Sequence, residues 1–131
     1  MSRTGIIDTH AHLDDNRFDS DRDQLIEKLG LELDAVINQG CTLASSAASI
    51  ALAEKYPFIY AAVGIHPEDL ATVKDDSYLD QLAAWAAHPK VVAIGEIGLD
   101  YYWKENEPRE VQLKRLRQQV DLARQVHLPV V

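Results

Sequence analysis

Two histidines separated by one residue stand near the start of the chain, in the segment Asp8-Thr9-His10-Ala11-His12. On an extended strand, alternate side chains project from the same face, so both imidazoles can converge on one cation. Imidazole nitrogen is the commonest metal ligand in proteins and suits zinc and related transition metals. Asp8 has the same parity and is expected to orient a ligand from behind. The segment therefore predicts a divalent-metal site held by His10 and His12.

A carboxylate follows an apolar run much later in the chain, where residues 95–102 read GEIGLDYY. Glu96 is placed at the end of that run. Burying a carboxylate without a partner is costly, and a nearby cation removes the cost by pairing with the ionised form. We therefore expect Glu96 to be a third metal ligand that can also bridge two cations. Asp100 and Tyr101 are expected to line the mouth of the site and contact the substrate.

Other polar and aromatic residues have weaker signals. His66 follows a third apolar run, in GIHP, and is expected to contact a substrate phosphate or assist proton transfer. His88 and His127 stand next to expected helix ends, where they would cap the C-terminus. Trp103 either stacks on a nucleobase or packs against the fold. Cys41 is expected to be a small, inert residue at a strand end.

The chain alternates short apolar runs with longer segments of helical periodicity. Strands are expected at residues 5–9, 34–38, 58–63 and 91–97, with the start of a fifth at 128–131. Helices are expected at residues 19–29, 43–56 and 77–87, and a long one opens at Pro108. Gly30 is expected to end the first helix, and Ser77 to cap the third together with Asp80. Strand–helix alternation with strands apolar on both faces predicts a parallel sheet covered by helices.

Two α/β architectures satisfy this pattern. An open doubly wound sheet suits the length, since a complete (β/α)₈ barrel typically needs about 250 residues. The candidate ligands, however, all follow strands, and barrel enzymes carry their sites at that end. We therefore predict a TIM-type (β/α) barrel fold, here about four to five βα units or half a barrel, in one domain spanning residues 1–131.

Composition limits the function classes. The 131 residues are 47% hydrophobic and 26% charged, which is ordinary for a globular protein. No apolar run reaches the roughly 18 residues needed to cross a bilayer, and no signal peptide is recognisable. We expect no membrane partner and a cytoplasmic location. The net charge of −8 argues against a broad basic surface for nucleic acid. It leaves room for a phosphate substrate, because bound cations can reverse the local sign.

The motifs together resemble those of the TatD family of metal-dependent deoxyribonucleases, within the amidohydrolase-like metal hydrolases. Three segments look like family landmarks in the family's order: IIDTHAHLD at 6–14, GIHP at 64–67 and GEIGLDYY at 95–102. The helix with Gln112, Gln119 and LAR at 122–124, followed by HLPVV, is similar to the stretch before the family's next motif. The resemblance covers essentially the whole chain.

The resemblance implies a TIM-like barrel with one or two divalent cations, Mg²⁺, Mn²⁺ or Zn²⁺, at the C-terminal rim. His10 and His12 would bind one metal, Glu96 would bind or bridge the pair, and His66 would lie in the substrate pocket. The implied activity is cleavage of phosphodiester bonds in DNA, often as a 3′-to-5′ exonuclease. The family's next metal-binding histidine follows PVV, and this sequence ends at Val131, so it holds about half of the expected ligands.

Two other interpretations stay open at the sequence level. The same metal site would serve an amidohydrolase-type enzyme that hydrolyses lactones, amides or esters. Alternatively, the chain is an inactive truncated half barrel. The open strand edges of such a fragment would pair with other chains and lead to self-association.

Overall fold

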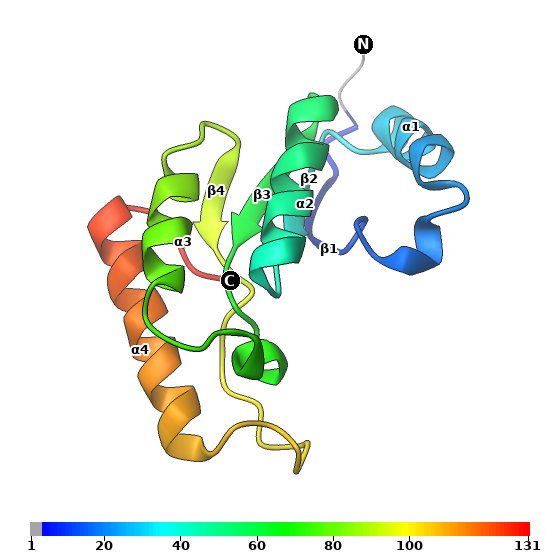
Figure 1. Ribbon diagram of the computed structural model, residues 1–131. Coiled ribbons are helices and arrows are strands. Elements are labelled where there is room, and N and C mark those ends of the chain that lie inside the picture. The colour runs from blue at the N-terminus through cyan, green and yellow to red at the C-terminus, as the bar shows by residue number, and fades with distance from the viewer. Residues whose placement is uncertain (1–3) are drawn as a thin grey trace.

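The computed structural model describes residues 4–131 and shows a four-stranded sheet with helices packed against it (Figure 1). The strands are β1 (Ile7–Ala11), β2 (Ala35–Gln39), β3 (Ile59–Val63) and β4 (Val91–Ile94). The helices are α1 (Arg22–Glu32), α2 (Leu43–Lys55), α3 (Tyr78–Ala86) and α4 (Arg109–Val126). Two 3₁₀ helices, η1 (Asn16–Phe18) and η2 (Pro67–Thr72), follow β1 and β3.

The strand order decides between the two expected architectures. The sheet runs β1-β2-β3-β4, and every neighbouring pair is parallel. Parallel crossovers are right-handed almost without exception, so successive connections that all move the same way leave their helices on one face. A doubly wound sheet needs a reversal of strand order, which these four strands do not have. The α/β fold is therefore of the barrel type, and the open-sheet alternative is wrong.

The segment after α4 begins a fifth strand, as predicted. Val130 forms a parallel bridge with Ile94 of β4. The Ile94 N–H donates to the Pro129 carbonyl at 2.9 Å, and the Val131 N–H donates to the Ile94 carbonyl at 3.0 Å. The segment that follows α4 therefore lies next to β4, so the strands stay in sequence order across the sheet.

The core lies between the sheet and its helices. Helix α2 packs on β2 and β3, α3 on β3 and β4, and α4 on β4 and α3. Burial of apolar side chains drives this packing. The fully buried large members are Ile26, Val36, Ile59, Val63, Ile65, Leu82 and Ile94. At the other edge of the sheet, Ile6 and Ile7 are 55% and 58% exposed, and β2 is the only strand within residues 4–131 that pairs with β1.

The ends of the strands that matter for the site differ from those expected. The first strand spans residues 7–11, not 5–9, so His10 lies within it and His12 just after it. The fourth strand ends at Ile94 rather than residue 97, so Glu96 lies in the following loop. His10 and His12 therefore flank the last residue of β1, and Glu96 lies two residues past the end of β4.

The first helix also differs, because tertiary contacts override the local signal. It spans residues 22–32 instead of 19–29, and Arg22 donates to the backbone carbonyls of Leu13, Asp14 and Asp15. Gly30 lies inside the helix and does not end it. A Cβ there would stand 3.0 Å from the Phe58 ring, so glycine is used for close packing.

Some of the predicted helix caps are present and others are not. His127 caps α4 as expected, in the left-handed conformation with φ 58°. Ser77 is the N-cap residue of α3 as expected, but its side chain makes no cap bond, so the predicted box with Asp80 is wrong. His88 lies past the end of α3, and its Nε2 contacts Glu54 Oε1 at 3.0 Å instead of capping the helix.

Two further helix starts differ from expectation. Pro108 is the N-cap residue of α4, just before the first turn where it was expected. Helix α2 begins with a capping box, formed by Thr42 and Ser45, that the sequence analysis missed. Within residues 4–131, no helix is long and apolar enough to cross a membrane.

Candidate metal centre

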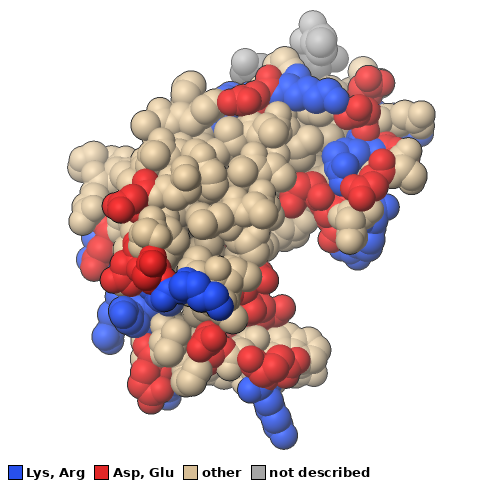
Figure 2. Space-filling view, viewed as in Figure 1, with Lys and Arg blue, Asp and Glu red and all other residues tan. Residues whose placement is uncertain are grey.

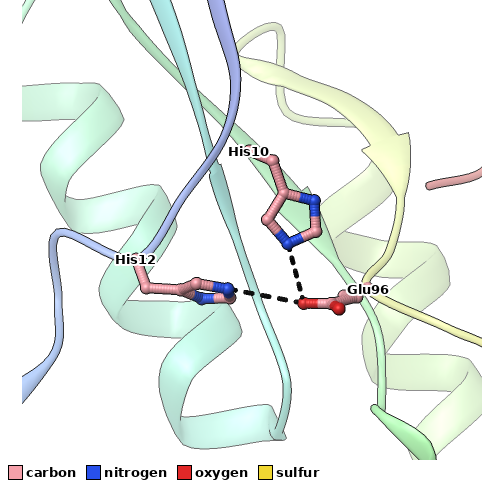
Figure 3. A group of neighbouring side chains, drawn as sticks. All are labelled: His10, His12 and Glu96. Carbon is pink, nitrogen blue, oxygen red and sulfur yellow. Dashed lines mark hydrogen bonds and ion pairs between the residues drawn. The ribbon is translucent and has the colours of Figure 1, made fainter.

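The two histidines of the first motif point at one carboxylate. His10 Nε2 lies 3.1 Å from Glu96 Oε2, and His12 Nε2 lies 3.5 Å from the same oxygen. Figure 3 shows both rings projecting from the β1 segment toward Glu96, which arrives from the segment after β4. The ring centroids are 5.2 Å apart with planes inclined by 70°. The predicted convergence of His10, His12 and Glu96 is present in the structure.

The strand that carries the histidines leaves regular pairing where the ligands stand. The register between β1 and β2 shifts between Asp8 and Ala11. At this irregularity, a side chain of β2 binds the β1 backbone: Gln39 Nε2 donates to the Thr9 carbonyl at 3.0 Å. The Asp8 carboxylate accepts the His10 backbone N–H at 3.0 Å, so Asp8 orients the ligand through its main chain.

Asn38 holds the other end of the ligand segment. Its Oδ1 accepts the Leu13 N–H at 2.6 Å, directly after His12. Its Nδ2 donates to Asp14 Oδ1 and to Ser49 Oγ, each at 2.8 Å. Asn38 and Gln39 are both completely buried. Two adjacent amides on β2 therefore pin the backbone on either side of the two histidines.

Glu96 is positioned by backbone contacts to β2 and β3. Its N–H donates to the Gly40 carbonyl at 2.6 Å, and the Gly95 N–H donates to the Val63 carbonyl at 2.9 Å. The peptide bond between Gly95 and Glu96 is cis. A Cβ on Gly95 would stand 2.9 Å from Val131 and 3.2 Å from Gln39 Oε1, so only glycine fits this close approach.

The site requires a curled sheet. In a flat sheet, β1 and β4 would be three strand spacings, or about 14 Å, apart. In this chain, His10 Nε2 of β1 lies 3.1 Å from Glu96 Oε2 in the loop after β4. The Glu96 N–H also donates to the carbonyl of Gly40, which follows β2 on the far side of β3. Figure 2 shows the resulting crescent shape, hollowed on one side. The barrel-like curvature is thus what brings ligands from both edges of the sheet together.

His66 joins the same carboxylate from the other side. Its Nε2 lies 3.5 Å from Glu96 Oε1, while its Nδ1 accepts the Glu68 N–H at 3.1 Å. Because Nδ1 is an acceptor, the proton of the neutral ring is on Nε2. The His66 N–H donates to the Cys41 carbonyl at 2.9 Å, and both backbone groups of Ile65 bind the buried Gln119 side chain.

Asp100 and Tyr101 lie on the loop between Glu96 and α4, and the structure gives them local contacts. The Asp100 carboxylate accepts the Tyr102 N–H at 2.8 Å. The Tyr101 ring is exposed, with the Arg109 guanidinium 5.6 Å from its centroid. Their expected contact with substrate stays a prediction.

Two further residues lie next to the site: Gln39, which the sequence did not indicate, and Cys41, which was expected to be inert. Gln39 Oε1 is buried without a hydrogen-bond partner among the described residues. The signal that could have revealed Gln39 is a polar pair, Asn38-Gln39, at the end of a strand expected to be buried on both faces. Cys41 is half-buried, with Sγ 3.9 Å from Glu96 Oε2. Burial, with nearby carboxylates, raises the pKa of its thiol to about 12, in keeping with an inert residue.

The donor set fits a small divalent cation. One nitrogen from each of His10 and His12 and one oxygen of Glu96 lie within 4.8 Å of one another. Ligand atoms around one tetrahedral Zn²⁺ lie roughly 3.3 Å apart, given metal–ligand distances near 2.0–2.1 Å. The distances of 3.1 and 3.5 Å from the imidazoles to Glu96 bracket that separation. Two imidazoles and one carboxylate also match known catalytic zinc sites, which use three protein ligands.

Comparison with known proteins agrees with this geometry. The sequence profile of the family described as TatD related DNase matches residues 7–131. The chain belongs to this TatD family. It is 38% identical over 129 residues to an uncharacterized metal-dependent hydrolase, YabD, of Bacillus subtilis, covering 96% of this chain and 49% of that protein. It is 34% identical over 126 residues to a 3′-5′ ssDNA/RNA exonuclease TatD of Cronobacter turicensis, covering 95% and 47%.

Solved structures of TatD proteins have the same fold. The TatD homologue YjjV of Escherichia coli superimposes with a TM-score of 0.84 at 36% identity, covering 95% of this chain and 49% of that one. A TatD family hydrolase of Entamoeba histolytica gives 0.87 at 27% identity, covering 99% and 50%. These are TIM-type barrels, and the chain spans about half the length of the relatives it matches.

Proposed function

We propose that this TatD chain hydrolyses phosphodiester bonds of DNA as a 3′-to-5′ exonuclease, using one or two divalent cations, Mg²⁺, Mn²⁺ or Zn²⁺. The observation that carries the proposal is the meeting of His10, His12 and Glu96 at the strand ends. Barrel enzymes carry their chemistry at this rim. Relatives called 3′-5′ ssDNA/RNA exonucleases support a nucleic-acid substrate.

Each residue of the centre has a distinct role in the proposal. His10 and His12 hold the cation with neutral imidazoles, and Glu96 holds it with one carboxylate oxygen or bridges a pair. When bound, a divalent cation supplies Lewis-acid polarisation of the phosphoryl group and makes a water acidic enough to act as a nucleophile near neutral pH.

His66 is proposed to bind the scissile phosphate. Its backbone and Nδ1 are fixed, and the proton on Nε2 is directed to the centre. This N–H can donate to a phosphate oxygen as charge accumulates there, or to the leaving oxygen. Asp100 and Tyr101 are proposed to line the mouth of the site, on the loop that follows Glu96.

The overall charge fits a centre that relies on cations. A chain of net charge −8 repels a polyanion at long range. Figure 2 shows acidic side chains scattered among basic ones on the visible face. Local positive charge must therefore come from the cation itself, which predicts that removing the ion abolishes phosphate binding as well as turnover.

Calorimetric titration with Mn²⁺ and Zn²⁺ tests the metal site in this chain. His10→Ala should lose most of the binding, because one of three ligands is removed. His88→Ala is the matched control, since it also deletes a histidine that contacts a glutamate: His88 Nε2 lies 3.0 Å from Oε1 of Glu54, which is on α2. The proposal fails if both variants bind metal as the parent does.

Release of mononucleotides from 3′-labelled and 5′-labelled single-stranded DNA tests the polarity of cleavage.

Self-association stays a prediction as well. The β1 edge, with exposed Ile6 and Ile7, is where another strand would pair. Light scattering after size exclusion should show a dimer that Ile7→Lys converts to a monomer. A monomeric parent chain would exclude this mode of association. The cytoplasmic location likewise stays a prediction.

A further inference from the structure

The loop after Glu96 concentrates exposed aromatic side chains. Nine large hydrophobic residues are exposed among residues 4–131, and four of them fall within residues 99–103. They are Leu99, Tyr101, Tyr102 and Trp103, of which the three aromatic ones are 54%, 80% and 47% exposed. We call this group of three the aromatic platform. Its exposure to water has no explanation in the packing of the described fold, whose core these rings do not join.

The platform is held in place by its own loop and by α4. The Tyr102 and Trp103 rings pack edge to face, with centroids 4.7 Å apart and planes inclined by 87°. The Asp100 N–H donates to Gln112 Oε1, and Gln112 Nε2 donates to the Asp100 carbonyl, both at 2.9 Å. Gln112 is only 2% exposed. Rings carried by a loop that is fixed in this way lose little entropy when a ligand stacks on them.

The platform also lies close to the metal centre along the chain. Tyr101 lies five positions after Glu96, so their Cα atoms are at most about 18 Å apart. Figure 1 shows this segment leading away from the end of β4 toward the start of α4, on the side of the sheet where the strands end. A short oligonucleotide can therefore reach the centre and the platform together.

We propose that Tyr101, Tyr102 and Trp103 stack on unpaired bases of a single-stranded nucleic acid whose phosphate reaches the metal centre. This inference rests on the proposed nuclease function and assigns its substrate a base-binding subsite. Aromatic rings are the usual partners of unpaired bases, since every base offers a π face. Arg109, over the Tyr101 ring, adds a guanidinium that can stack or meet a phosphate.

The charge of the chain favours bases over phosphates as the source of affinity. Three acidic residues (Glu105, Glu107 and Glu110) and two basic ones (Lys104 and Arg109) follow the platform directly. Counterions are released from a nucleic acid when Lys and Arg neutralise its phosphates, and this segment has only two basic residues. Binding should therefore depend only weakly on salt, unlike binding to a basic groove.

The test measures binding of a short oligothymidine and of an abasic oligonucleotide of the same length, by fluorescence anisotropy in EDTA. We expect the parent chain to bind the oligothymidine more tightly. Tyr102→Ala and Trp103→Ala should each weaken that binding roughly 5- to 150-fold, toward the level of the abasic oligonucleotide. Trp103→Phe should restore part of the affinity. Leu31→Ala is the matched control, since Leu31 is 79% exposed on α1, away from the loop.

The outcomes separate this inference from the proposed function. Equal binding of the two oligonucleotides, no detectable binding of either, or an equal loss in Leu31→Ala would each overturn the platform. The platform variants should keep the Mn²⁺ affinity of the parent. Failure of the parent to bind Mn²⁺ would count against the metal centre, while the base-binding result in EDTA would still be read independently.

Discussion

Gln39 allows a prediction in which stability and metal affinity change in different ways. Its Nε2 donates to the Thr9 carbonyl at 3.0 Å, while its buried Oε1 has no partner among the described residues. Gln39→Met keeps an unbranched side chain of similar length and removes both amide atoms. The substitution thus deletes one hydrogen bond and one buried, unpaired acceptor at the same time.

The two effects on stability oppose each other. Losing the hydrogen bond costs about 0.5–1.5 kcal/mol, and the exposed Thr9 carbonyl can bind water instead. Removing an unsatisfied buried oxygen returns about 1–3 kcal/mol. We therefore expect the free energy of unfolding to stay the same or to rise by about 1 kcal/mol. The metal dissociation constant should rise about 10-fold, because the backbone beside His10 is no longer pinned.

Urea denaturation of the metal-free chain and Mn²⁺ titration by calorimetry measure the two quantities. Gln119→Met is the matched control, because both amide atoms of the buried Gln119 are bonded to Ile65. That control should destabilise the fold by about 1–3 kcal/mol by leaving two backbone groups unpaired. If Gln39→Met is destabilised as much as the control, the carbonyl oxygen of Gln39 is satisfied and the reasoning is refuted. Unchanged metal affinity would refute the positioning role.

Three further predictions follow from contacts described for this chain. Gly95→Ala should destabilise the fold by about 1–3 kcal/mol because its Cβ would stand 2.9 Å from neighbouring atoms, whereas Gly98→Ala, with open space around it, should not; equal urea midpoints for the two variants would contradict this. Hydrogen bonds from Gln118 and Arg115 lower the pKa of Asp76 below 3.8, so its stabilisation exists above that pH and is lost as the pH falls through the lowered pKa. Asp76→Asn should therefore unfold more easily than the parent at neutral pH but not in acid, and a pH-independent difference in thermal midpoints would argue against the ion pair. Saturating Mn²⁺ should raise the thermal midpoint and EDTA should reverse the rise, since the ion binds only the folded state; a midpoint insensitive to metal would show that the three ligands do not hold it.

The sequence was most informative where chemistry follows from local spacing. The parity of His10 and His12 on an extended segment predicted that both rings point one way, and they do. The alternation of strands and helices predicted a parallel sheet, and the placement of ligands after strands favoured the barrel type correctly.

What the sequence could not show depends on contacts between distant residues. Asn38 and Gln39 reach the ligand strand across 25 and 30 positions, and local periodicity carries no record of such bonds. The start of α1 is set by Arg22 binding carbonyls of the preceding loop, against the earlier start that its own sequence suggested. Ser77 occupies the predicted N-cap position of α3, but its N–H is bonded to the Asp75 carboxylate and its side chain makes no cap bond, a local detail that residue preferences did not reveal.

The 86 positions between His10 and Glu96 have a consequence for biosynthesis. At a translation rate of 5–20 residues per second, the ribosome adds Glu96 roughly 4–17 s after His10. During that interval the nascent chain offers a cation only two imidazoles, which hold it far more weakly than the full set. Durable capture of the ion therefore comes late, once the fourth strand has been made and has docked, and the rate of metal uptake after synthesis would report when the sheet is finished.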